Sequence, residues 1–356
     1  MKRAALIFNR PEELAADRPA EAQERPRDAG RLLVSDGEGH HHARFLDLPR
    51  FLQAGDLLVV NRSATLPASL PARGLEGSFM FNLSTDYGAG LWLAEPRRSA
   101  AKPGPVPGLQ SGSLITVSGQ EARLAAPYPG IPRLWFVQFT GDVQHLMRKA
   151  GRPIRYGYLQ GEYDLGIYQT LFAAYPGSAE MPSAAYPFTR RVLSGLEARG
   201  VQLASIVLHT GVSSLEVESD DLAGHTLYPE PYWVPRATAA AVNAAQREGR
   251  RVIALGTTAV RALESAWDGG RVRAASGFTR LYLHPERRPQ VVDGLLTGLH
   301  DPVTSHLAML YALAGPQLIR EAYAAAVSHG YRWHEFGDSH LIVARGKVAG
   351  GRSDSR

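Results

Sequence analysis

Hydroxyl and charged residues gather in the segment Arg250–Trp267, RRVIALGTTAVRALESAW. Its apolar run Val252–Leu255 is long enough for a buried strand but too short for a buried helix, and apolar residues then recur at helical spacing after Gly256. In open α/β sheets, ligands bind where such a strand meets the following helix. Thr257 and Thr258 are predicted to cap the helix, whose first N–H groups would receive an anionic or carboxylate group. An ordinary capped helix is the alternative.

The same helix carries Arg261 and Glu264, three residues apart. Residues at this spacing are neighbours on a helix surface, so we expect the two side chains to pair. An exposed pair of this kind contributes only a few tenths of a kcal/mol, and an ordinary surface pair is therefore an equal alternative to a role in ligand binding.

Histidines form a second group of candidate residues. His209 directly follows the predicted strand Leu203–Leu208, and Asn61 ends the predicted strand Leu57–Asn61. The last third of the chain holds further candidates: His300, His306, His334, Glu335, Asp338 and His340. Two histidines and a carboxylate can bind a metal ion, but the spacing differs from HExxH. We therefore expect no metal, and a hydrogen-bonding or proton-handling cluster instead. The run His40–His42 is predicted to lie on a solvated loop.

The composition indicates a two-domain globular protein. The chain has 356 residues, 44% of them hydrophobic and 21% charged, and a net charge of +5. The charge favours a polyanionic partner only mildly, because no lysine block or basic helix stands out. Cysteine is absent, which excludes disulfides, thiolate metal sites and cysteine nucleophiles. The sequence shows no apolar run of about 18 residues and no secretory signal, so we expect a cytoplasmic protein without a membrane partner.

A change of pattern between residues 65 and 155 predicts an inserted domain. Short alternating segments (SFMFNL, LWLAE, SLITVS and LWFVQF) are separated by Gly, Pro and Ser clusters. This pattern is typical of a small antiparallel barrel. The stretch Ala100–Gly112 is expected to be a long exposed, mobile loop.

The rest of the chain, residues 1–64 and 156–356, reads as alternating strands and helices. We expect an α/β fold: a mixed-sheet α/β/α sandwich with the barrel inserted. The elements predicted for it are strands at Arg31–Val34, Thr279–Leu283, Gln290–Val292 and Leu341–Ala344, and helices at Tyr168–Tyr175, Phe188–Arg199, Thr238–Glu248 and Pro316–His329.

Several of these segments together resemble a known family along nearly the whole chain. They include FLDLPRFLQAGDLLVVN, YQTLFAAYPGSAEMP, LHTGVSSLEVE, RRVIALGTTAVRALE, VVDGLLTGLH and YRWHEFGDSHLIV. The chain resembles the S-adenosylmethionine:tRNA ribosyltransferase-isomerases of queuosine biosynthesis, as a divergent member.

The resemblance implies a reaction as well as a fold. Members transfer and isomerise the ribosyl part of S-adenosylmethionine onto 7-aminomethyl-7-deazaguanine in tRNA, which gives epoxyqueuosine and releases adenine and methionine. S-adenosylmethionine is a co-substrate, and no metal is expected. The sulfonium acidifies the adjacent C5′ protons, so the path needs a general base, an acid for adenine and a dry pocket.

The family's motifs match this chain only in part. In the segments corresponding to VNDTRVIPARL and APTAGLHFT, Arg62–Ala64 and Tyr186-Pro187 replace family residues, so an arginine and a histidine are missing. Ser213-Ser214 replaces Gly-Thr after His209, and Tyr228 replaces a histidine. These departures leave two alternatives open: ribosyl transfer to a small-molecule acceptor, or cleavage of S-adenosylmethionine, on the same scaffold; and a catalytically silent RNA-binding paralogue.

We expect tRNA as the default partner, and the motifs imply a set of site residues. The predicted catalytic residues are His209, His300 and Asp338. The predicted substrate-binding residues are Asn61, Tyr168, Glu230, Gly256, Thr257, Thr258, Arg261, Glu264 and Ser305. The oligomeric state and the identity of the general base are left open.

Overall fold

The computed structural model describes residues 1–356 except 76, 100–105, 213–215, 218 and 344–356. Six residues of the predicted mobile loop, the Ser213-Ser214 substitution and the last residue of the strand predicted at Leu341–Ala344 therefore lie outside the described residues. No helix in the described part of the chain is long and apolar enough to cross a membrane.

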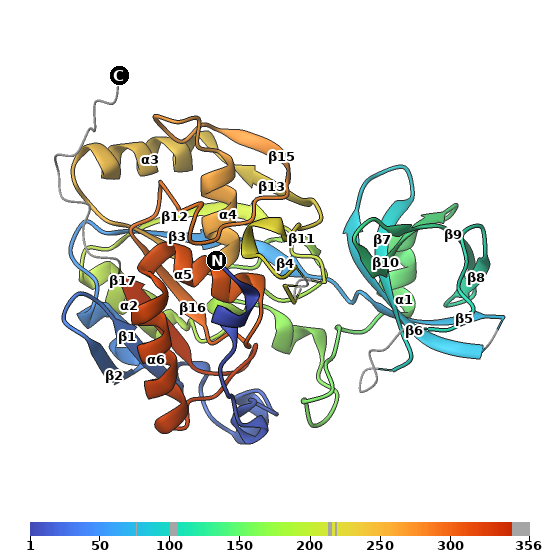
Figure 1. The fold of residues 1–356 in the computed structure, drawn as a ribbon, viewed down its shortest axis with the longest axis horizontal. Coiled ribbons are helices and arrows are strands. Elements are labelled where there is room, and N and C mark those ends of the chain that lie inside the picture. The colour runs from blue at the N-terminus through green and yellow to red at the C-terminus, as the bar shows by residue number, and fades with distance from the viewer. Residues whose placement is uncertain (76, 100–105, 213–215, 218, 344–356) are drawn as a thin grey trace.

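A mixed sheet forms the centre of the larger domain (Figure 1). In the described part of the chain it has nine strands in the order β15-β13-β12-β3-β14-β16-β17-β1-β2. The strands β12, β3, β14 and β16 are parallel neighbours, and β17 pairs antiparallel with β16. The bounds are β1 Arg31–Ser35, β2 His40–Arg44, β3 Leu57–Asn61, β12 Gln202–Leu208, β13 Glu230–Val234, β14 Val252–Leu255, β15 Ala275–Thr279, β16 Gly294–Gly298 and β17 Ser339–Val343.

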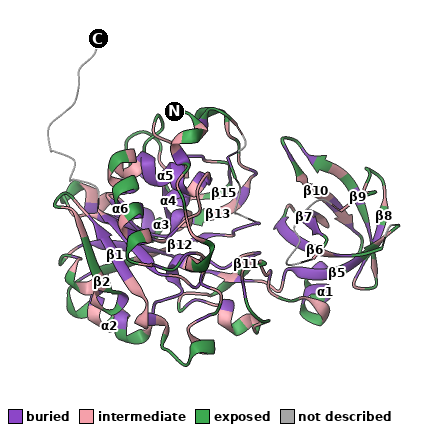
Figure 2. Cartoon of the chain, turned by 60° about the horizontal axis from the view of Figure 1, so that its bottom comes forward, coloured by how far each residue is buried: buried purple, intermediate pink, exposed green. Residues whose placement is uncertain are grey.

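Helices cover both faces of this sheet because its strands alternate apolar side chains between two cores. Leu57 and Val59 of β3 face one core, with α3, α4, α5 and α6, and Leu58 and Val60 face the other, with α2. Figure 2 shows the buried sheet between the two layers. The helices are α2 Arg190–Ala198, α3 Arg236–Arg247, α4 Thr257–Ser265, α5 Ser305–Ala314 and α6 Pro316–Ser328. Short 3-10 helices are η1 Arg3–Leu6, η2 Glu12–Leu14, η3 Glu21–Gln23, η4 Arg27–Ala29, η5 Phe45–Arg50, η6 Leu165–Tyr168, η7 Ser183–Ala185 and η8 Leu222–Gly224.

A closed antiparallel barrel forms the smaller domain, in the order β10-β7-β6-β5-β8-β9. Its strands are β5 Ser69–Gly74, β6 Gly77–Asp86, β7 Leu91–Arg97, β8 Leu114–Val117, β9 Gln120–Tyr128 and β10 Ile131–Phe139, followed by α1 Val143–Ala150. Its core is separate from those of the sheet. The strands β4 Ser63–Thr65 and β11 Tyr175–Ser178 pair in parallel between the two domains. The predicted fold class, an α/β/α sandwich with an inserted barrel, is confirmed; the domain bounds 65 and 155 stay a prediction.

Two predictions for segments in the N-terminal half of the chain are wrong. His40–His42 lie in the edge strand β2 and pair with β1, not in a loop. The segment Tyr168–Tyr175 is not helical, because the Gln169 side chain bonds the backbone N–H and C=O of Thr65 and holds the chain away from helical geometry.

Two predicted strands near the C-terminal half are also misplaced, and side chains explain both. The strand expected at Thr279–Leu283 ends at Thr279, since Arg261 donates to the carbonyls of Thr279 and Leu281. The strand expected at Gln290–Val292 does not form, because the Glu264 carboxylate accepts the backbone N–H groups of this segment.

Candidate active site

A cavity of about 900 Å³ opens at the carboxyl ends of β3, β12, β14 and β16. The residues at these strand ends reach it: Asn61, Thr210, Leu255 and Thr297. Arg97 of the barrel and several residues of the N-terminal segment also line the cavity. The main cavity, as we call it, therefore combines both domains with the edge of the sheet where ligands of open α/β folds bind.

Helix α4 begins at this cavity with its first turn uncapped. Gly256 occupies the N-cap with φ 85°, and no described side chain caps the helix. The prediction that Thr257 and Thr258 cap it is wrong, since both lie inside the first turn and Asn61 Nδ2 donates to Thr258 Oγ1 at 3.2 Å. Gly256, Thr257 and Thr258 line the cavity, and the uncapped N–H groups at the start of a helix are where an anionic group binds.

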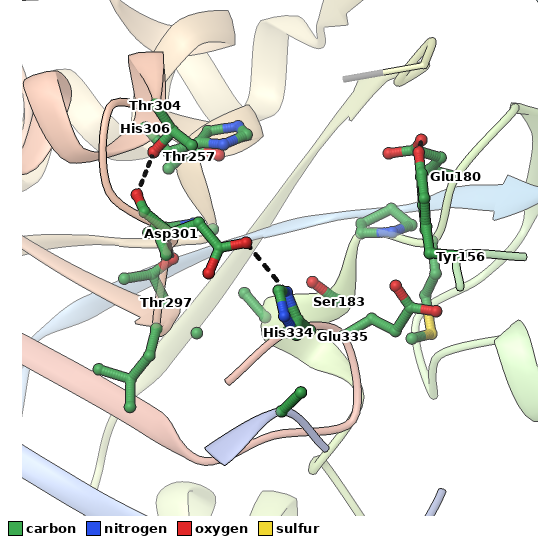
Figure 3. Close-up of a pocket in the computed structure, with 18 of the residues that line it drawn as sticks. Tyr156, Glu180, Ser183, Thr257, Thr297, Asp301, Thr304, His306, His334 and Glu335 are labelled. Carbon is green, nitrogen blue, oxygen red and sulfur yellow. Dashed lines mark hydrogen bonds and ion pairs between the residues drawn. The ribbon is translucent and has the colours of Figure 1, made fainter. Parts of the chain in front are cut away.

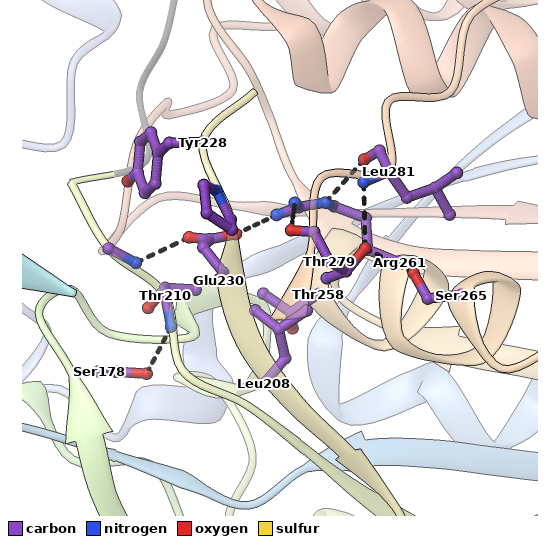
Figure 4. A network of polar contacts seen from close by, with 12 residues as sticks. Ser178, Leu208, Thr210, Tyr228, Glu230, Thr258, Arg261, Ser265, Thr279 and Leu281 are labelled. Carbon is purple, nitrogen blue, oxygen red and sulfur yellow. Dashed lines mark hydrogen bonds and ion pairs between the residues drawn. The ribbon is translucent and has the colours of Figure 1, made fainter. Parts of the chain in front are cut away.

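A buried ion pair between Arg261 and Glu230 forms the part of the cavity wall beside α4 (Figure 4). The Glu230 carboxylate also accepts the N–H of Gly211 at 2.7 Å. Both residues are more than nine-tenths buried, and the guanidinium makes further bonds to backbone carbonyls. Arg261 is therefore paired with Glu230 across the sheet, whereas we expected it to pair with Glu264 along the helix.

Aromatic rings and carboxylates form the opposite wall (Figure 3). The rings of Tyr156 and Tyr158 stack at 6.1 Å, and Tyr158 stacks on His334 at 4.0 Å with an interplanar angle of 12°. Tyr156 donates a hydrogen bond to Glu180, and Tyr158 donates to Glu335 Oε2 at 2.6 Å. This wall can stack on a flat ring and can face a cation with two carboxyl groups.

Glu335 has the protonation behaviour of a neutral-pH acid or base. Burial raises its pKa to about 7, while the hydrogen bond from Tyr158 opposes that rise. Burial and the nearby Glu335 raise the pKa of Tyr158 well above its ordinary value, so Tyr158 remains a hydrogen-bond donor. A carboxyl group with a pKa near the working pH can exchange protons efficiently.

His300 lies in the cavity as a neutral imidazole. Burial, and then the neighbouring His306, lower the pKa of His300 well below its usual value. The two rings stack at 4.8 Å, and Thr297 Oγ1 lies 2.9 Å from His300 Nε2. Burial also lowers the pKa of His306 to about 4. Both rings can accept or donate hydrogen bonds in the cavity without adding positive charge.

The predicted residues that line the main cavity are Asn61, Glu230, Gly256, Thr257, Thr258, Arg261 and His300. Asn61 is also a structural residue: its amide bonds the backbone of Leu208 and Ser63 and so joins β12 to the end of β3. These residues come from distant segments, and the sheet edge brings them together.

His209 and Asp338 do not line this cavity. His209 faces a separate cavity of about 630 Å³ between the two domains, which we call the interdomain cavity, and its Nδ1 lies 2.7 Å from Ser63 Oγ. Asp338 accepts hydrogen bonds from the backbone N–H groups of Arg31 and Arg332 at 2.7 and 2.8 Å. That arrangement favours a structural role for Asp338.

Three predicted binding residues are likewise held elsewhere. The Tyr168 ring packs against Phe336 at 5.4 Å, outside the main cavity. Glu264 caps the Gln290–Val292 segment as described above. Ser305 begins α5 beside a smaller cavity behind Arg261.

The tyrosine wall is the main feature that the sequence did not predict. Tyr156 and Tyr158 follow the barrel in the segment YGYLQGEYD, whose density of tyrosines is the one available signal. Glu180 carries no signal of its own in the sequence, and Glu335 is a candidate only as a member of the C-terminal histidine cluster. No group of three or more His, Cys, Asp or Glu side chains with metal-binding geometry occurs among the described residues.

Known proteins resemble this chain over nearly its full length. The family model described as queuosine biosynthesis protein matches residues 4–342. A protein from Rubrobacter xylanophilus named S-adenosylmethionine:tRNA ribosyltransferase-isomerase is 38% identical over 353 residues, 98% of this chain and 99% of that protein. A protein of the same name from Thermus thermophilus is 38% identical and covers 89% of this chain and 94% of its own length.

A solved structure agrees with these relatives. The crystal structure of S-adenosylmethionine tRNA ribosyltransferase from Thermotoga maritima has a TM-score of 0.54 and 27% sequence identity to this chain. The similarity covers 95% of this chain and all of that one. The chain is therefore a member of the queuosine biosynthesis protein family.

Proposed function

We propose that this protein is an S-adenosylmethionine:tRNA ribosyltransferase-isomerase that acts in the cytoplasm. It transfers and isomerises the ribosyl group of S-adenosylmethionine onto 7-aminomethyl-7-deazaguanine in tRNA. The observation that carries the proposal is the main cavity, in which an uncapped helix terminus faces a wall of stacked rings and carboxyl groups. Family membership supports the same reaction.

The two walls suit the two ends of S-adenosylmethionine. The α-carboxylate of the methionine part binds at the N–H groups of α4. The adenine ring stacks on the wall of Tyr156 and Tyr158, and Glu180 and Glu335 neutralise the sulfonium. Arg261, held by Glu230, keeps the end of α4 in place.

The chemistry proceeds from the sulfonium. A base removes a proton from C5′, which gives an ylide stabilised by the adjacent sulfur. The ylide carbon forms a bond to C1′ as adenine leaves C1′ with its bonding pair and takes up a proton. The amine of the tRNA base then forms a bond to C1′ and loses a proton while the C1′–O4′ bond breaks, and O4′ closes the epoxide on C5′ as the C5′–S bond breaks and methionine leaves. A positioned base and acid each contribute about 10²–10⁴-fold to such steps.

We assign the proton transfers to Glu335 and the positioning of the sugar or adenine to His300. The Glu335 carboxyl group, with its pKa of about 7, is half ionised at neutral pH and can take a proton and return it. His300 is neutral but weakly basic, since burial lowers its pKa far below 6.5. It is therefore better suited to hydrogen bonding than to proton abstraction.

Adenine release tests the proposal. The full-length protein is incubated with S-adenosylmethionine, with and without tRNA that carries the aminomethyl base, and adenine is followed by chromatography. Release that requires this tRNA is the expected result. Release without RNA would instead support a small acceptor or simple cleavage, and no release with retained RNA binding would support a silent paralogue.

A further inference from the structure

Exposed aromatic rings gather on edge strand β15, its neighbour β13 and the nearby strand β11. Among the described residues, three aromatic side chains are exposed: Tyr175 at 41%, Trp233 at 44% and Phe278 at 52%. They lie on β11, β13 and β15, on the side of the sheet domain that faces the barrel (Figure 1). Exposed apolar groups that gather in this way mark an interaction site.

The three rings and Tyr87 form two contacting pairs on neighbouring strands, which we call the aromatic strip. Trp233 pairs with Ser276 on β15, so Phe278, two residues further on, is its diagonal neighbour on the same face. Tyr175 meets Trp233 at 6.1 Å and 85°, and Tyr87 meets Phe278 at 5.5 Å. The strip therefore crosses from the sheet domain to the end of barrel strand β6.

The strip borders the interdomain cavity, which lies next to the main cavity. Tyr87 and Phe278 line the interdomain cavity together with His209. The residue after His209, Thr210, lines the main cavity, as does Glu230, whose neighbour Pro231 lines the interdomain cavity. A partner bound along the strip can thus reach both cavities at once.

Arginines flank the strip. The guanidinium of Arg62 lies 5.2 Å from the centre of the Tyr175 ring, and Arg148 lines the interdomain cavity. Arg280 is exposed two residues after Phe278. Asp86 also lines this cavity, and its Oδ1 accepts the N–H of Gly88 at 2.8 Å.

We propose that the aromatic strip and the interdomain cavity bind an unpaired segment of the tRNA acceptor. Bases stack on the rings, the arginines face the phosphates, and one unpaired base enters the interdomain cavity while its neighbour reacts in the main cavity. Rings interleaved with arginines are how proteins hold single-stranded RNA, because every base offers a flat face and every linkage a negative charge. This inference rests on the proposed function, which supplies the RNA.

Binding of a fluorescent RNA stem–loop with an unpaired loop tests the inference. Fluorescence anisotropy gives its Kd for the wild type, for Trp233→Ala and for Phe278→Ala. Each ring lost is expected to raise Kd roughly tenfold, since stacking on one aromatic side chain is worth about 1–3 kcal/mol per base. The same stem closed by a minimal loop should bind weakly to all variants.

Matched variants separate stacking from folding and from apolar area. Phe278→Tyr keeps the ring and should bind as the wild type, whereas Phe278→Leu keeps apolar bulk and should not. Leu75→Ala removes an exposed apolar side chain from the far turn of the barrel and should leave Kd unchanged. Arg62→Gln should reduce the slope of log Kd against log salt by about one. Affinity for S-adenosylmethionine, measured by calorimetry, reports whether each variant keeps its main cavity.

The outcomes distinguish this inference from the proposed function. One outcome is that the wild type releases adenine only with tRNA while both alanine variants bind the stem–loop with wild-type Kd. In that case the aromatic strip is not the RNA-binding surface, and it contacts a protein instead. If the wild type neither binds the RNA nor needs it for adenine release, the proposed function and this inference both fail.

Discussion

Two carboxyl groups line the main cavity but have different partners: one is paired with a cation and the other is not. Glu230 faces the guanidinium of Arg261 and a backbone N–H, so its negative charge is fully matched inside the protein. Glu335 faces the neutral hydroxyl of Tyr158, and burial raises its pKa to about 7. The first arrangement holds elements in place, and the second leaves a proton free to move.

The difference follows from where each residue sits. Glu230 begins a strand of the sheet, where Arg261 reaches it from α4. Glu335 lies in the irregular segment between α6 and β17, beside the tyrosines that follow the barrel. Glu230, whose carboxylate is paired, therefore belongs to the sheet domain. Glu335, which can titrate, lies where the chain that comes from the barrel joins the sheet domain.

Replacing Glu335 should have the largest effect on catalysis. Glu335→Gln keeps the size of the side chain but cannot take a proton, so adenine release should fall by about 10²–10⁴-fold. The wild-type rate should rise with pH through about 7, because the base acts in its ionised form, and the variant should lose this dependence. Glu197→Gln, an exposed position on α2, serves as the control. An unchanged rate and pH profile would exclude Glu335 as the base.

Breaking the Glu230–Arg261 pair should act first on stability. Arg261→Met leaves the Glu230 carboxylate buried without its cation, which typically costs about 3–5 kcal/mol of unfolding free energy. Urea denaturation followed by circular dichroism measures the loss. The double variant Glu230→Gln with Arg261→Met should recover part of it, since no charge is then stranded. Equal stability of the wild type and the single variant would show that the pair is not structural.

Asp338 offers a smaller test of the same distinction. Asp338→Asn replaces one acceptor oxygen by an amide that faces a backbone N–H, so stability should fall by about 1–3 kcal/mol. Adenine release per folded molecule should stay at the wild-type level. A folded variant that lost activity a hundredfold would restore Asp338 to the catalytic group that the sequence predicted.

The sequence predicted the elements that follow from local apolar patterns and missed the features that depend on contacts between distant residues. Buried strands such as Leu57–Asn61 and the helix after Gly256 follow from local apolar patterns, and they occur as expected. The fold class and the insertion of a barrel follow from the same patterns. Where a distant side chain decides the backbone, local pattern fails, as for the segment that Glu264 binds.

The residues of the site also divide into those that local pattern predicts and those that it does not. Residues next to strand ends, such as Thr257 and Arg261, could be predicted because parallel strands end at one edge of the sheet. Asp338 and His209 also follow or precede strands, yet they face other parts of the structure. Tyr158 approaches Glu335 across 177 positions of sequence, and no spacing rule anticipates such a contact.

Removing the Tyr158 hydroxyl should have the smallest and most specific effect. In the wild type this hydroxyl donates to the Glu335 carboxylate and so opposes the rise in its pKa. Tyr158→Phe should therefore raise the pKa that governs adenine release by about one unit or more, because a hydrogen bond to a charged group is worth about 1.5–3 kcal/mol and one pKa unit corresponds to about 1.4 kcal/mol. The rate at high pH should change little. Tyr156→Phe keeps the stacked wall but loses a bond to Glu180 instead, so its profile should not move. A shift of equal size in both variants would mean that the tyrosines affect the pocket as a whole, and that Tyr158 does not tune Glu335.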